Sequence, residues 1–481
     1  MPKEWEIEGF LEVRDNVLDI DGVSAVDLAR EYGTPLFVYS ESRIRHNIER
    51  LNAAGQKIDG PLKLCYAAKA MSTMGILRAV KDAGCDIEVN SGGELWKALK
   101  AGFAPEQIIF NGTSKEIWEL EMAVDNGIYA IQVDSPFELS LIEGTAARLG
   151  KKASVSLRLV PEIETGTHSG LQTALLTSKF GMMPDEAFTL FSKYKDSPRV
   201  DLCGIHVHIG SQNPDPIVYS EALSMLFTSL LRIYNESGVV LKHVNLGGGF
   251  PVDYLRDRSQ ESAFPAEQKT MFSADFEPSD AVSTAWKNVE DAAAAGGNSH
   301  LLDNLTILLE PGRSIIADAG VCLTTVRNKK ERPVAEVDIN SSAAHRSLTV
   351  NDTWLLTDAG FNILLSMETY KWYYHLIAAD RSGEPHDTPY KVAGPLCDGG
   401  DVYFDIEGEG RLPDHRLLPA GIDASSGSVL ALLNCGAYSL AQASQYNGRF
   451  LPPVVLIGVD GTRRLIRKRD TFDDLISNDI F

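Results

Sequence analysis

The chain has 481 residues, a formal net charge of −21 and an apolar fraction of 44%. This length is enough for two or three domains, and the apolar fraction is enough for a large core. The acidic residues are spread along the chain and form no acidic tail, which argues against nucleic acid as a partner. The same charge predicts little affinity for anionic membrane surfaces.

The N-terminal residues and the cysteines bear on the cellular compartment. The segment Met1–Glu8 contains no apolar stretch typical of a secretory signal. No uninterrupted apolar run is long enough to span a bilayer. The six cysteines are scattered without a CxxC pair, which fits free thiols in a reducing compartment better than a disulfide framework or a zinc site. We therefore expect a cytoplasmic protein without a bound metal.

The first predicted elements are short. Residues Leu11–Asp15 and Val17–Ile20 have the pattern of β structure, and a short helix is predicted near Val26–Tyr32. We assign these elements to an N-terminal segment, residues 1–35, that contributes to a β-rich domain.

Short apolar segments alternate with amphipathic ones from Leu64 to Glu310. This alternation predicts a parallel sheet with crossover helices, and eight strands are the number found in a closed (β/α)₈ barrel. We therefore expect an α/β fold with a TIM-type barrel over residues 36–316. The expected strands are Leu64–Ala68, Cys85–Val89, Gln107–Phe110, Tyr129–Val133, Ser154–Leu159, Cys203–Val207, Lys242–Leu246 and Thr306–Leu309, and the helical stretches include Thr73–Ala83, Gly93–Ala101 and Ser220–Asn235.

The pattern changes towards the C-terminus. Residues Asp253–Asn304 form an excursion between the last two barrel strands, and its charged stretch Arg256–Asp280 is expected to be mobile in part. After about residue 316, short strands are separated by Gly, Pro, Asn and Asp turns, which predicts an all-β barrel or sandwich over residues 317–481. The expected strands are Val321–Val326, Val334–Val337, Trp354–Thr357, Tyr390–Ala393, Val402–Phe404, Val429–Leu433, Val454–Val459 and Arg463–Ile466.

Ionisable or otherwise special residues stand at the ends of the predicted barrel strands. Because the carboxyl ends of barrel strands form the rim on which active sites are built, we expect these side chains to lie around one site. Asn111 and Asp134 have a simpler alternative role, which is to cap the following helices. The set comprises Lys69, Glu88, Asn111, Asp134, Arg158, His208, Gly247–Gly249 and Glu310.

Two glycine-containing turns predict a phosphate site. Gly247–Gly249 follow the seventh predicted strand, and Pro311–Ser314 follow the eighth. Glycines let backbone N–H groups approach an anion, and the phosphate site of barrel enzymes often lies after these two strands.

His206 and His208 share one face of the sixth predicted strand because side chains alternate along a strand. A metal pair is disfavoured because no third ligand is suitably spaced. The alternatives are two packed histidines, or His208 lying flat against an aromatic ring.

Lys69 is the most informative of the rim residues. Alone, a lysine at a strand end is better explained by an amine that reaches solvent. Together with a phosphate site, a stacking histidine and Glu310, it fits pyridoxal 5′-phosphate. Lys69 would bind the cofactor aldehyde, and Glu310 would pair with the pyridine nitrogen and keep it protonated, which makes the ring a strong electron sink.

The chain resembles the pyridoxal-phosphate decarboxylases of the alanine-racemase fold, namely diaminopimelate decarboxylase and its ornithine and arginine relatives. The resemblance extends from about Gly33 to Arg449. Its motifs are Tyr66–Lys69, Asn90–Glu94, Ser178–Gly181, His206–Ser211, Gly247–Gly249, Glu310–Ser314, Gly394–Asp401 and Gly436–Tyr438.

The resemblance implies a role for each matching residue. Lys69 holds the cofactor, His208 stacks on its ring, and Glu88 and Arg158 lie near the ring or the lysine. The phosphate is held by Ser211, Gly247, Gly248, Gly249, Gly312 and Tyr438, with Arg313 also on the cofactor side. The amino-acid substrate would meet Arg313, Tyr370, Asp398 and Tyr438. Cys397, from a second subunit, would help to protonate the product, which implies a homodimer.

The chain also departs from the family pattern. Position 88 usually holds aspartate, and an arginine usually precedes the residue matching Tyr370, where it binds the distal carboxylate of diaminopimelate in a bidentate manner. Here the stretch Ile363–Glu368 contains no arginine, and Glu368 adds a negative charge. Met71 stands where asparagine is usual, and Asp398 replaces the usual glutamate after Cys397.

These departures, and the strings Ala393–Asp401 and Arg464–Arg467, favour a branch that decarboxylates D-lysine or D-ornithine to a diamine. The alternative substrates are meso-diaminopimelate, with L-lysine as the product, and a specialised biosynthetic amino acid.

Two other functions compete with that of a decarboxylase. A racemase shares the fold but places arginine at the pyridine nitrogen, against Glu310. A non-catalytic relative would usually lack the intact cofactor site.

Overall fold

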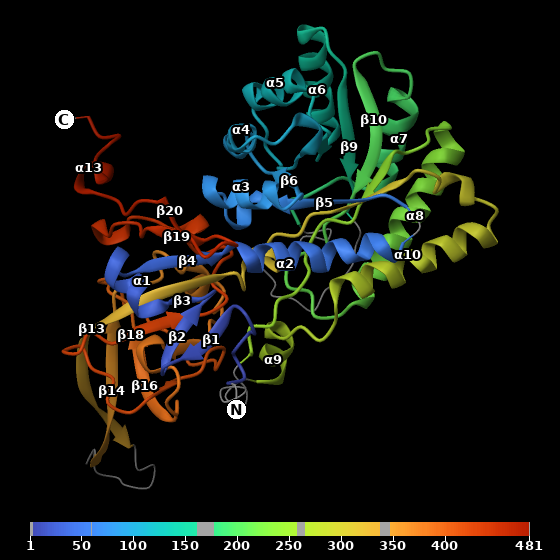
Figure 1. The fold of residues 1–481 in the computed structure, drawn as a ribbon. Coiled ribbons are helices and arrows are strands. Elements are labelled where there is room, and N and C mark those ends of the chain that lie inside the picture. Colours follow the sequence, from blue (N-terminus) through green and yellow to red (C-terminus); the bar gives the residue numbers. More distant parts are fainter. Residues whose placement is uncertain (1–2, 59, 161–177, 257–264, 337–346, 481) are drawn as a thin grey trace, which may run out of the picture. The chain divides into compact units, whose positions relative to one another are not determined.

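The structure is a computed structural model that describes residues 3–58, 60–160, 178–256, 265–336 and 347–480. It divides into two compact units, which we describe separately (Figure 1). The β-rich unit comprises residues 1–43, 253–272 and 317–481, and the barrel unit comprises residues 44–252 and 273–316. The boundary near the N-terminus falls within helix α2 (Glu41–Asn52).

The barrel unit contains a closed barrel of eight parallel strands, as predicted. The strands follow one another around the barrel in the order β10-β11-β12-β5-β6-β7-β8-β9, and β9 pairs with β10 to close it. The strands are β5 (Leu62–Ala67), β6 (Asp86–Val89), β7 (Ile108–Phe110), β8 (Ala130–Val133), β9 (Ala153–Arg158), β10 (Val200–His206), β11 (His243–Asn245) and β12 (Thr306–Leu309). The barrel is a packed core, since Cys65, Ile109 and Leu308 from three of these strands form a buried cluster.

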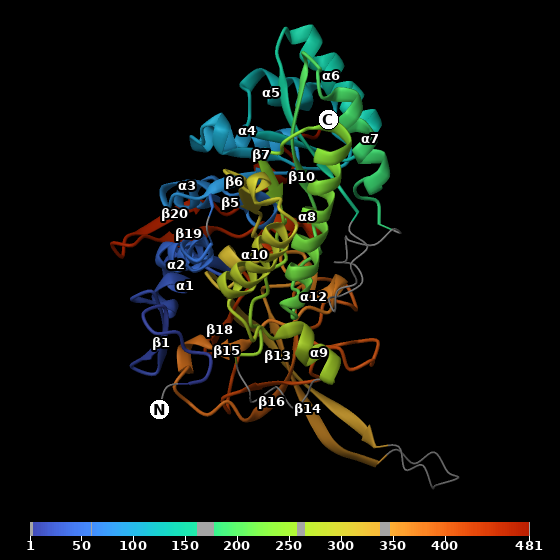
Figure 2. The same ribbon diagram turned by 90° about the vertical axis from the view of Figure 1, so that its right-hand side faces the viewer.

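Helices connect these strands, and α8 and α10 lie side by side (Figure 2). Ser91 and Ser135 cap α4 and α6 by accepting a hydrogen bond from the N–H three residues on. The helices are α3 (Met74–Asp82), α4 (Gly92–Ala101), α5 (Ile117–Asn126), α6 (Pro136–Leu149), α7 (Pro184–Tyr194), α8 (Ile217–Ser237), α10 (Pro278–Ala295) and α11 (Arg313–Ile316).

The β-rich unit contains a nine-stranded sheet and a small N-terminal sheet. The large sheet has the order β17-β16-β14-β13-β4-β19-β20, with β18 paired to β13 and β15. Its strands are β4 (Leu36–Ser40), β13 (Gly320–Glu336), β14 (Ser347–Thr357), β15 (Leu376–Ala378), β16 (Thr388–Ala393), β17 (Arg416–Leu418), β18 (Val429–Leu432), β19 (Val454–Ile457) and β20 (Arg463–Arg467). The small sheet is β1 (Leu11–Arg14), β2 (Val17–Ile20) and β3 (Val23–Ser24), and the helices are α1 (Ala25–Tyr32), α9 (Ala266–Phe272), α12 (Leu365–Thr369) and α13 (Phe472–Leu475).

Some expected elements differ from the observed ones. Val321–Val326 and Val334–Val337 were expected as two strands, but residues 320–336 form the single strand β13; Val337 lies outside the described residues. Val402–Phe404 makes only an isolated bridge from Val402 to Ala393. Its apolar pattern reflects burial of Tyr403, whose hydroxyl donates to the carbonyl of Ala359 (2.8 Å).

The segments placed at the domain boundaries also have their own contacts. Leu36–Ser40, expected at the start of the barrel domain, is β4 and pairs with β13 and β19 of the β-rich unit. The charged stretch Arg256–Asp280 contains α9 and the beginning of α10, and its residues 257–264 lie outside the described residues.

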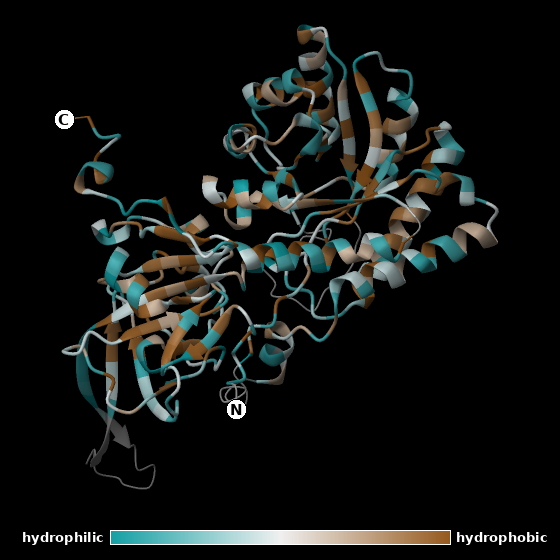
Figure 3. Cartoon of the chain, viewed as in Figure 1, coloured by the Kyte–Doolittle hydropathy of each residue, from teal (hydrophilic) through white to brown (hydrophobic). Residues whose placement is uncertain are grey.

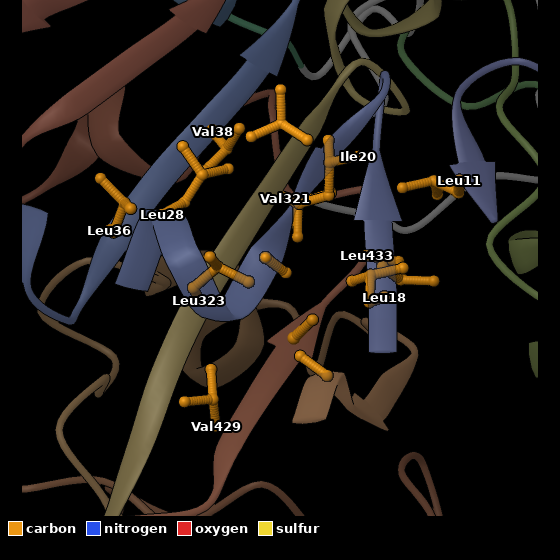
Figure 4. Close-up of a cluster of buried hydrophobic side chains, with 14 of the residues drawn as sticks. Leu11, Leu18, Ile20, Leu28, Leu36, Val38, Val321, Leu323, Val429 and Leu433 are labelled. Carbon is orange, nitrogen blue, oxygen red and sulfur yellow. The ribbon is translucent and has the colours of Figure 1, made fainter. Parts of the chain in front are cut away.

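The core of the β-rich unit joins its two sheets. Figure 4 shows side chains from β1, β2, α1, β4 and β13 packed together, among them Leu18, Leu28, Val38 and Leu323. In Figure 3 hydrophobic residues gather in the strands that form this core, whereas α10 of the barrel unit alternates between hydrophobic and hydrophilic residues. Among the described residues, no helix combines the length and the hydropathy needed to cross a membrane.

Candidate active site

The predicted rim residues of the barrel lie at or just beyond strand ends. Lys69 belongs to a single 3₁₀ turn (Ala68–Ala70) directly after β5, and its side chain is exposed. Barrel closure pairs β12 with β5. Glu310 follows β12 and Lys69 follows β5, so the two residues stand after neighbouring strands. The backbone N–H of Ala67 donates to the carbonyl of Pro311 (3.0 Å), which ties these two strand ends together.

Glu310 is a buried carboxylate surrounded by donors. Asn245 Nδ2 donates to Oε1 (2.6 Å), Asn111 Nδ2 donates to Oε2 (2.9 Å), and His206 Nε2 lies 3.4 Å from Oε2. Burial opposes ionisation, but His206 and Asn245 outweigh it and lower the pKa of Glu310 to about 2. Glu310 is therefore an anion at neutral pH, as pairing with a protonated ring nitrogen requires.

Glu88 lies on β6 and is fully buried. Its Oε1 accepts a hydrogen bond from Asn111 Nδ2 (2.8 Å), and its Oε2 has no hydrogen-bond partner among the described residues. Burial raises the pKa of Glu88 to about 8, against the attraction of Lys69 and with added repulsion from Glu310. Glu88 is therefore mostly protonated at neutral pH.

His208 lies just beyond β10, where it meets the glycine triplet. Its Nδ1 accepts a hydrogen bond from the N–H of Gly248 (3.2 Å), which leaves the ring neutral with its proton on Nε2. Burial, with Lys69 and Arg158 nearby, holds the pKa of His208 well below its ordinary value. In the part of the chain that the structure describes, no cluster of His, Cys, Asp or Glu is arranged to hold a metal ion.

The glycine triplet is packed too closely for side chains. A Cβ at Gly247 would lie 2.7 Å from the carbonyl oxygen of Val207, one at Gly248 would lie 2.3 Å from that of Glu310, and one at Gly249 would lie 2.8 Å from that of Gly210. Next to it, buried Arg313 donates through Nε to Ser211 Oγ (3.2 Å). A hydroxyl and a guanidinium are groups that bind phosphate, whereas the N–H groups of Gly247 and Gly248 already donate to Asn245 Oδ1 and His208 Nδ1.

The barrel residues therefore fit pyridoxal phosphate. Ser211 and Arg313 would hold the phosphate beside the glycine triplet, and the buried Oδ1 of Asn111 has no hydrogen-bond partner among the described residues. A buried polar atom without a partner is costly, which is consistent with a site built for a polar ring.

Replacing Gly248 with alanine should strongly weaken cofactor binding. The added Cβ meets the backbone of Glu310, which cannot move aside as a side chain could. We expect at least about a hundredfold weaker binding of pyridoxal phosphate, measured by titrating the cofactor-free protein. Gly144→Ala on α6 is the control, because nothing lies within 4 Å of its added Cβ. Equal affinities of the two variants would contradict a phosphate site beside the triplet.

Arg158 ends β9 and is held in place by the Ser178–Gly181 motif. Its guanidinium lies over the ring of Phe180 (4.3 Å to the ring centre), and the N–H of Gly181 donates to Asp134 Oδ1 (2.8 Å). Burial lowers the pKa of Arg158, and the charge of Asp134 opposes that shift. Arg158 is thereby fixed as a buried cation at the rim.

Neither Asn111 nor Asp134 is a helix cap, so that alternative was wrong for both. The residue before α5 is Glu116, and α6 is capped by Ser135. Asn245 was missed by the sequence analysis, although it orients Glu310 and its Oδ1 accepts a hydrogen bond from the N–H of Gly247 (2.9 Å). The available signal was a polar residue at the end of β11, directly before the glycine triplet.

The remaining predicted site residues, Tyr370, Cys397, Asp398 and Tyr438, lie in the β-rich unit. Cys397 is an exposed free thiol whose N–H donates to Asn447 Oδ1 (2.6 Å). Asp398 accepts a hydrogen bond from the hydroxyl of Tyr446 (3.2 Å). The loop that carries both residues is fixed by Asp401, which accepts from the N–H of Leu396 (2.7 Å).

Glu368 is not an isolated charge. Lys371 Nζ lies 3.0 Å from Glu368 Oε2 and 3.0 Å from Glu407 Oε2, and Lys371 is almost fully buried. The N–H of Tyr370 donates to the carbonyl of Ser366 (3.0 Å), which closes helix α12. The single ammonium is shared by the two carboxylates, so it offsets the negative charge of Glu368 only in part.

Comparison with known proteins gives one consistent result. Residues 44–317 match the family described as pyridoxal-dependent decarboxylase, pyridoxal binding domain. The chain is 32% identical to diaminopimelate decarboxylase of Methanocaldococcus jannaschii, over 98% of this chain and 96% of that protein. It is also 32% identical to the Bacillus subtilis enzyme of the same name, over 96% and 95% of the two chains.

A solved structure agrees with these relatives. The crystal structure of the M. jannaschii diaminopimelate decarboxylase in complex with L-lysine superposes with a TM-score of 0.81 at 31% identity, and 98% of each chain is covered. The D-ornithine and D-lysine branch expected from the sequence finds no support among these relatives, and the decarboxylase family match likewise gives none to a racemase.

Proposed function

Because the chain belongs to the diaminopimelate decarboxylase family of pyridoxal-phosphate-dependent enzymes, we propose that it converts meso-diaminopimelate to L-lysine and CO₂. That it is an amino-acid decarboxylase follows from the family. The choice of substrate rests on one observation, the 32% identity to an enzyme of that name along 98% of this chain. The relative crystallised with L-lysine, the expected product, adds support.

The barrel residues then have defined tasks. Lys69 binds the cofactor aldehyde, His208 lies against the ring, and Ser211, the glycine triplet and Gly312 hold the phosphate. The cofactor, when bound, supplies the electron sink that accepts the electron pair left by CO₂. Glu310 keeps the ring nitrogen protonated, and the buried Arg158 adds a fixed positive charge to the site.

This chain differs from the family pattern where the distal carboxylate of meso-diaminopimelate would bind. Ser366 and Glu368 occupy the stretch in which the family resemblance places an arginine. Lys371 pairs with Glu368 but also with Glu407, so it compensates only part of the negative charge near a second carboxylate. This pairing weakens one argument for a diamine-forming branch but does not remove it.

A substrate panel tests the proposal. We expect CO₂ release from meso-diaminopimelate with L-lysine as the product, and at least about tenfold lower kcat/KM for D-lysine, D-ornithine and their L-forms, since the loss of a charge-assisted contact costs about 1.5–3 kcal/mol. Lys69→Ala enzyme is the blank. Turnover of D-lysine or D-ornithine without turnover of meso-diaminopimelate would restore the first hypothesis.

The homodimer and the role of Cys397 form a second part of the proposal. If Cys397 of one subunit serves the cofactor of the other, mixing Lys69→Ala with Cys397→Ala should regenerate activity. After subunit exchange, about a quarter of all sites are intact, because half of the dimers are mixed and each has one intact site. The measurement is kcat of the mixture against each variant alone. A mixture no more active than its components would contradict shared sites.

A further inference from the structure

Two buried acids in the barrel share a single amide donor. Asn111 Nδ2 lies 2.8 Å from Glu88 Oε1 and 2.9 Å from Glu310 Oε2. An amide nitrogen carries two hydrogens, so Asn111 donates one to each acid. All three side chains are at most 5% exposed, so water does not separate them. The two acids are therefore close neighbours in an interior that screens charge poorly.

The surroundings of the two acids are unequal. Both oxygens of Glu310 have donors, from Asn111 and Asn245. The other charged or titratable groups around it are His206, His208, His243, Cys65 and Arg158. Glu88 has a donor on one oxygen only, and its other oxygen has no partner among the described residues. The charged groups that face Glu88 are Lys69, Glu94 and Glu310.

This asymmetry decides where a proton resides. Two carboxylates at such a separation cannot both ionise without a large repulsion. A negative charge is stabilised where more donors surround it, which is at Glu310. A proton is best placed on the acid with fewer donors, which is Glu88.

We propose that Glu88 and Glu310 form a pair that holds one proton on Glu88, and that Asn111 is the positioning residue that joins them. Glu310 thereby remains an anion for the ring nitrogen, while Glu88 stays a neutral acid in the region influenced by Lys69. The pKa of Glu88 near 8 and that of Glu310 near 2 agree with this division. The pair does not depend on which amino acid the enzyme decarboxylates.

The length of residue 88 is part of the arrangement. An aspartate, which is usual here in the family that the sequence resembles, would be one carbon–carbon bond shorter, roughly 1.5 Å. Its carboxylate would lie beyond hydrogen-bond distance of Asn111 at the same backbone position. The glutamate therefore gives this chain an acid pair that an aspartate would not form in the same way.

Infrared spectroscopy against pH tests the pair directly, since protonated carboxyl and carboxylate groups absorb separately. The experiment uses the full-length chain, both loaded with pyridoxal phosphate and after cofactor removal. We expect a protonated carboxyl signal at pH 7 that disappears with a midpoint near pH 8 and is absent from Glu88→Gln. A spectrum without that signal, or one in which Glu88→Gln retains it, would overturn the proposal.

The role of Asn111 needs a separate variant. Asn111→Leu removes the donor to ionised Glu88, so the midpoint should rise by about one pH unit. Asn47→Leu is the control, because it removes a buried amide that donates to the carbonyl of Ile315 (3.0 Å). If Asn111→Leu does not fold, Glu310→Gln serves instead, and removal of the neighbouring anion should lower the midpoint. Identical titrations of wild type and Glu310→Gln, or of Asn111→Leu and Asn47→Leu, would exclude a linked pair.

Discussion

Lys69→Ala should yield a folded protein that no longer binds its cofactor covalently. Its decarboxylase activity should be lower by about 10²–10⁴-fold. The loss is large because Lys69 is proposed to bind the cofactor aldehyde, and alanine has no amine that could replace it. The fold should survive because the Lys69 side chain is exposed at the barrel rim. Surface substitutions of this kind usually change stability by less than about 0.5 kcal/mol.

The measurement for Lys69→Ala separates chemistry from folding. Borohydride reduction followed by mass spectrometry should add one cofactor to the wild-type chain and none to the variant. Lys151→Ala is the matched control, because Lys151 is a surface lysine that pairs with Asp125 in the same unit. Covalent labelling of Lys69→Ala, with thermal unfolding like that of wild type, would show that another lysine binds the aldehyde.

The barrel and its rim could be predicted because the sequence patterns that indicate them extend over only a few neighbouring residues. Strand and helix periods are visible in short windows, and parallel strands bring their carboxyl ends to one rim whatever the details of packing. The sequence positions of Lys69, Glu88 and Glu310 at strand ends were therefore enough to place them around one site. The family comparison agrees with the cofactor inferred from them.

The hydrogen bonds inside that site could not be predicted. Asn111 contacts Glu310, which lies 199 residues away, and such a pairing depends on barrel closure and side-chain direction. Helix capping is a local explanation for an asparagine after a strand, and it was wrong here because Asn111 donates to two acids instead. Asn245 gave an even weaker signal, since it stands in a short strand that also contains His243, and a polar residue in such a strand has many possible roles.

Local pattern was least reliable in the β-rich unit. The run Asn328–Arg332 is charged and polar, so it was interpreted as a break between two strands, although β13 continues through it. The strand pairs with β14 along this stretch, and successive residues from Lys330 to Pro333 are exposed, so both faces of the strand lie in solvent here and no apolar alternation marks it. Val402–Phe404 was wrongly predicted to be a strand, because the buried side chains of this loop give the same apolar pattern as a buried strand.

Replacing Glu310 with glutamine should lower kcat by about 10²–10³-fold while the cofactor still binds. Glutamine cannot carry the negative charge that keeps the ring nitrogen protonated, and its NH₂ group would face a donor, either Asn111 or Asn245. The Lys69 linkage and the phosphate site remain, so covalent cofactor content should be near that of wild type. Steady-state kinetics and borohydride labelling of the same preparation distinguish these two effects.

The pH dependence of stability supplies an independent check on Glu310. Its pKa in the folded protein, about 2, lies below the ordinary value of 4.5. A lowered pKa stabilises the folded state above the ordinary pKa, and that contribution is lost as the pH falls towards 2. The difference in unfolding free energy between wild type and Glu310→Gln should therefore be largest near neutral pH and shrink below about pH 4.

Denaturant unfolding at pH 7 and at pH 3 measures this difference, with Glu119→Gln as the control for a buried glutamate elsewhere in the barrel unit. A difference that stays constant with pH, together with an unchanged kcat, would mean that Glu310 is not the ionised partner of the ring.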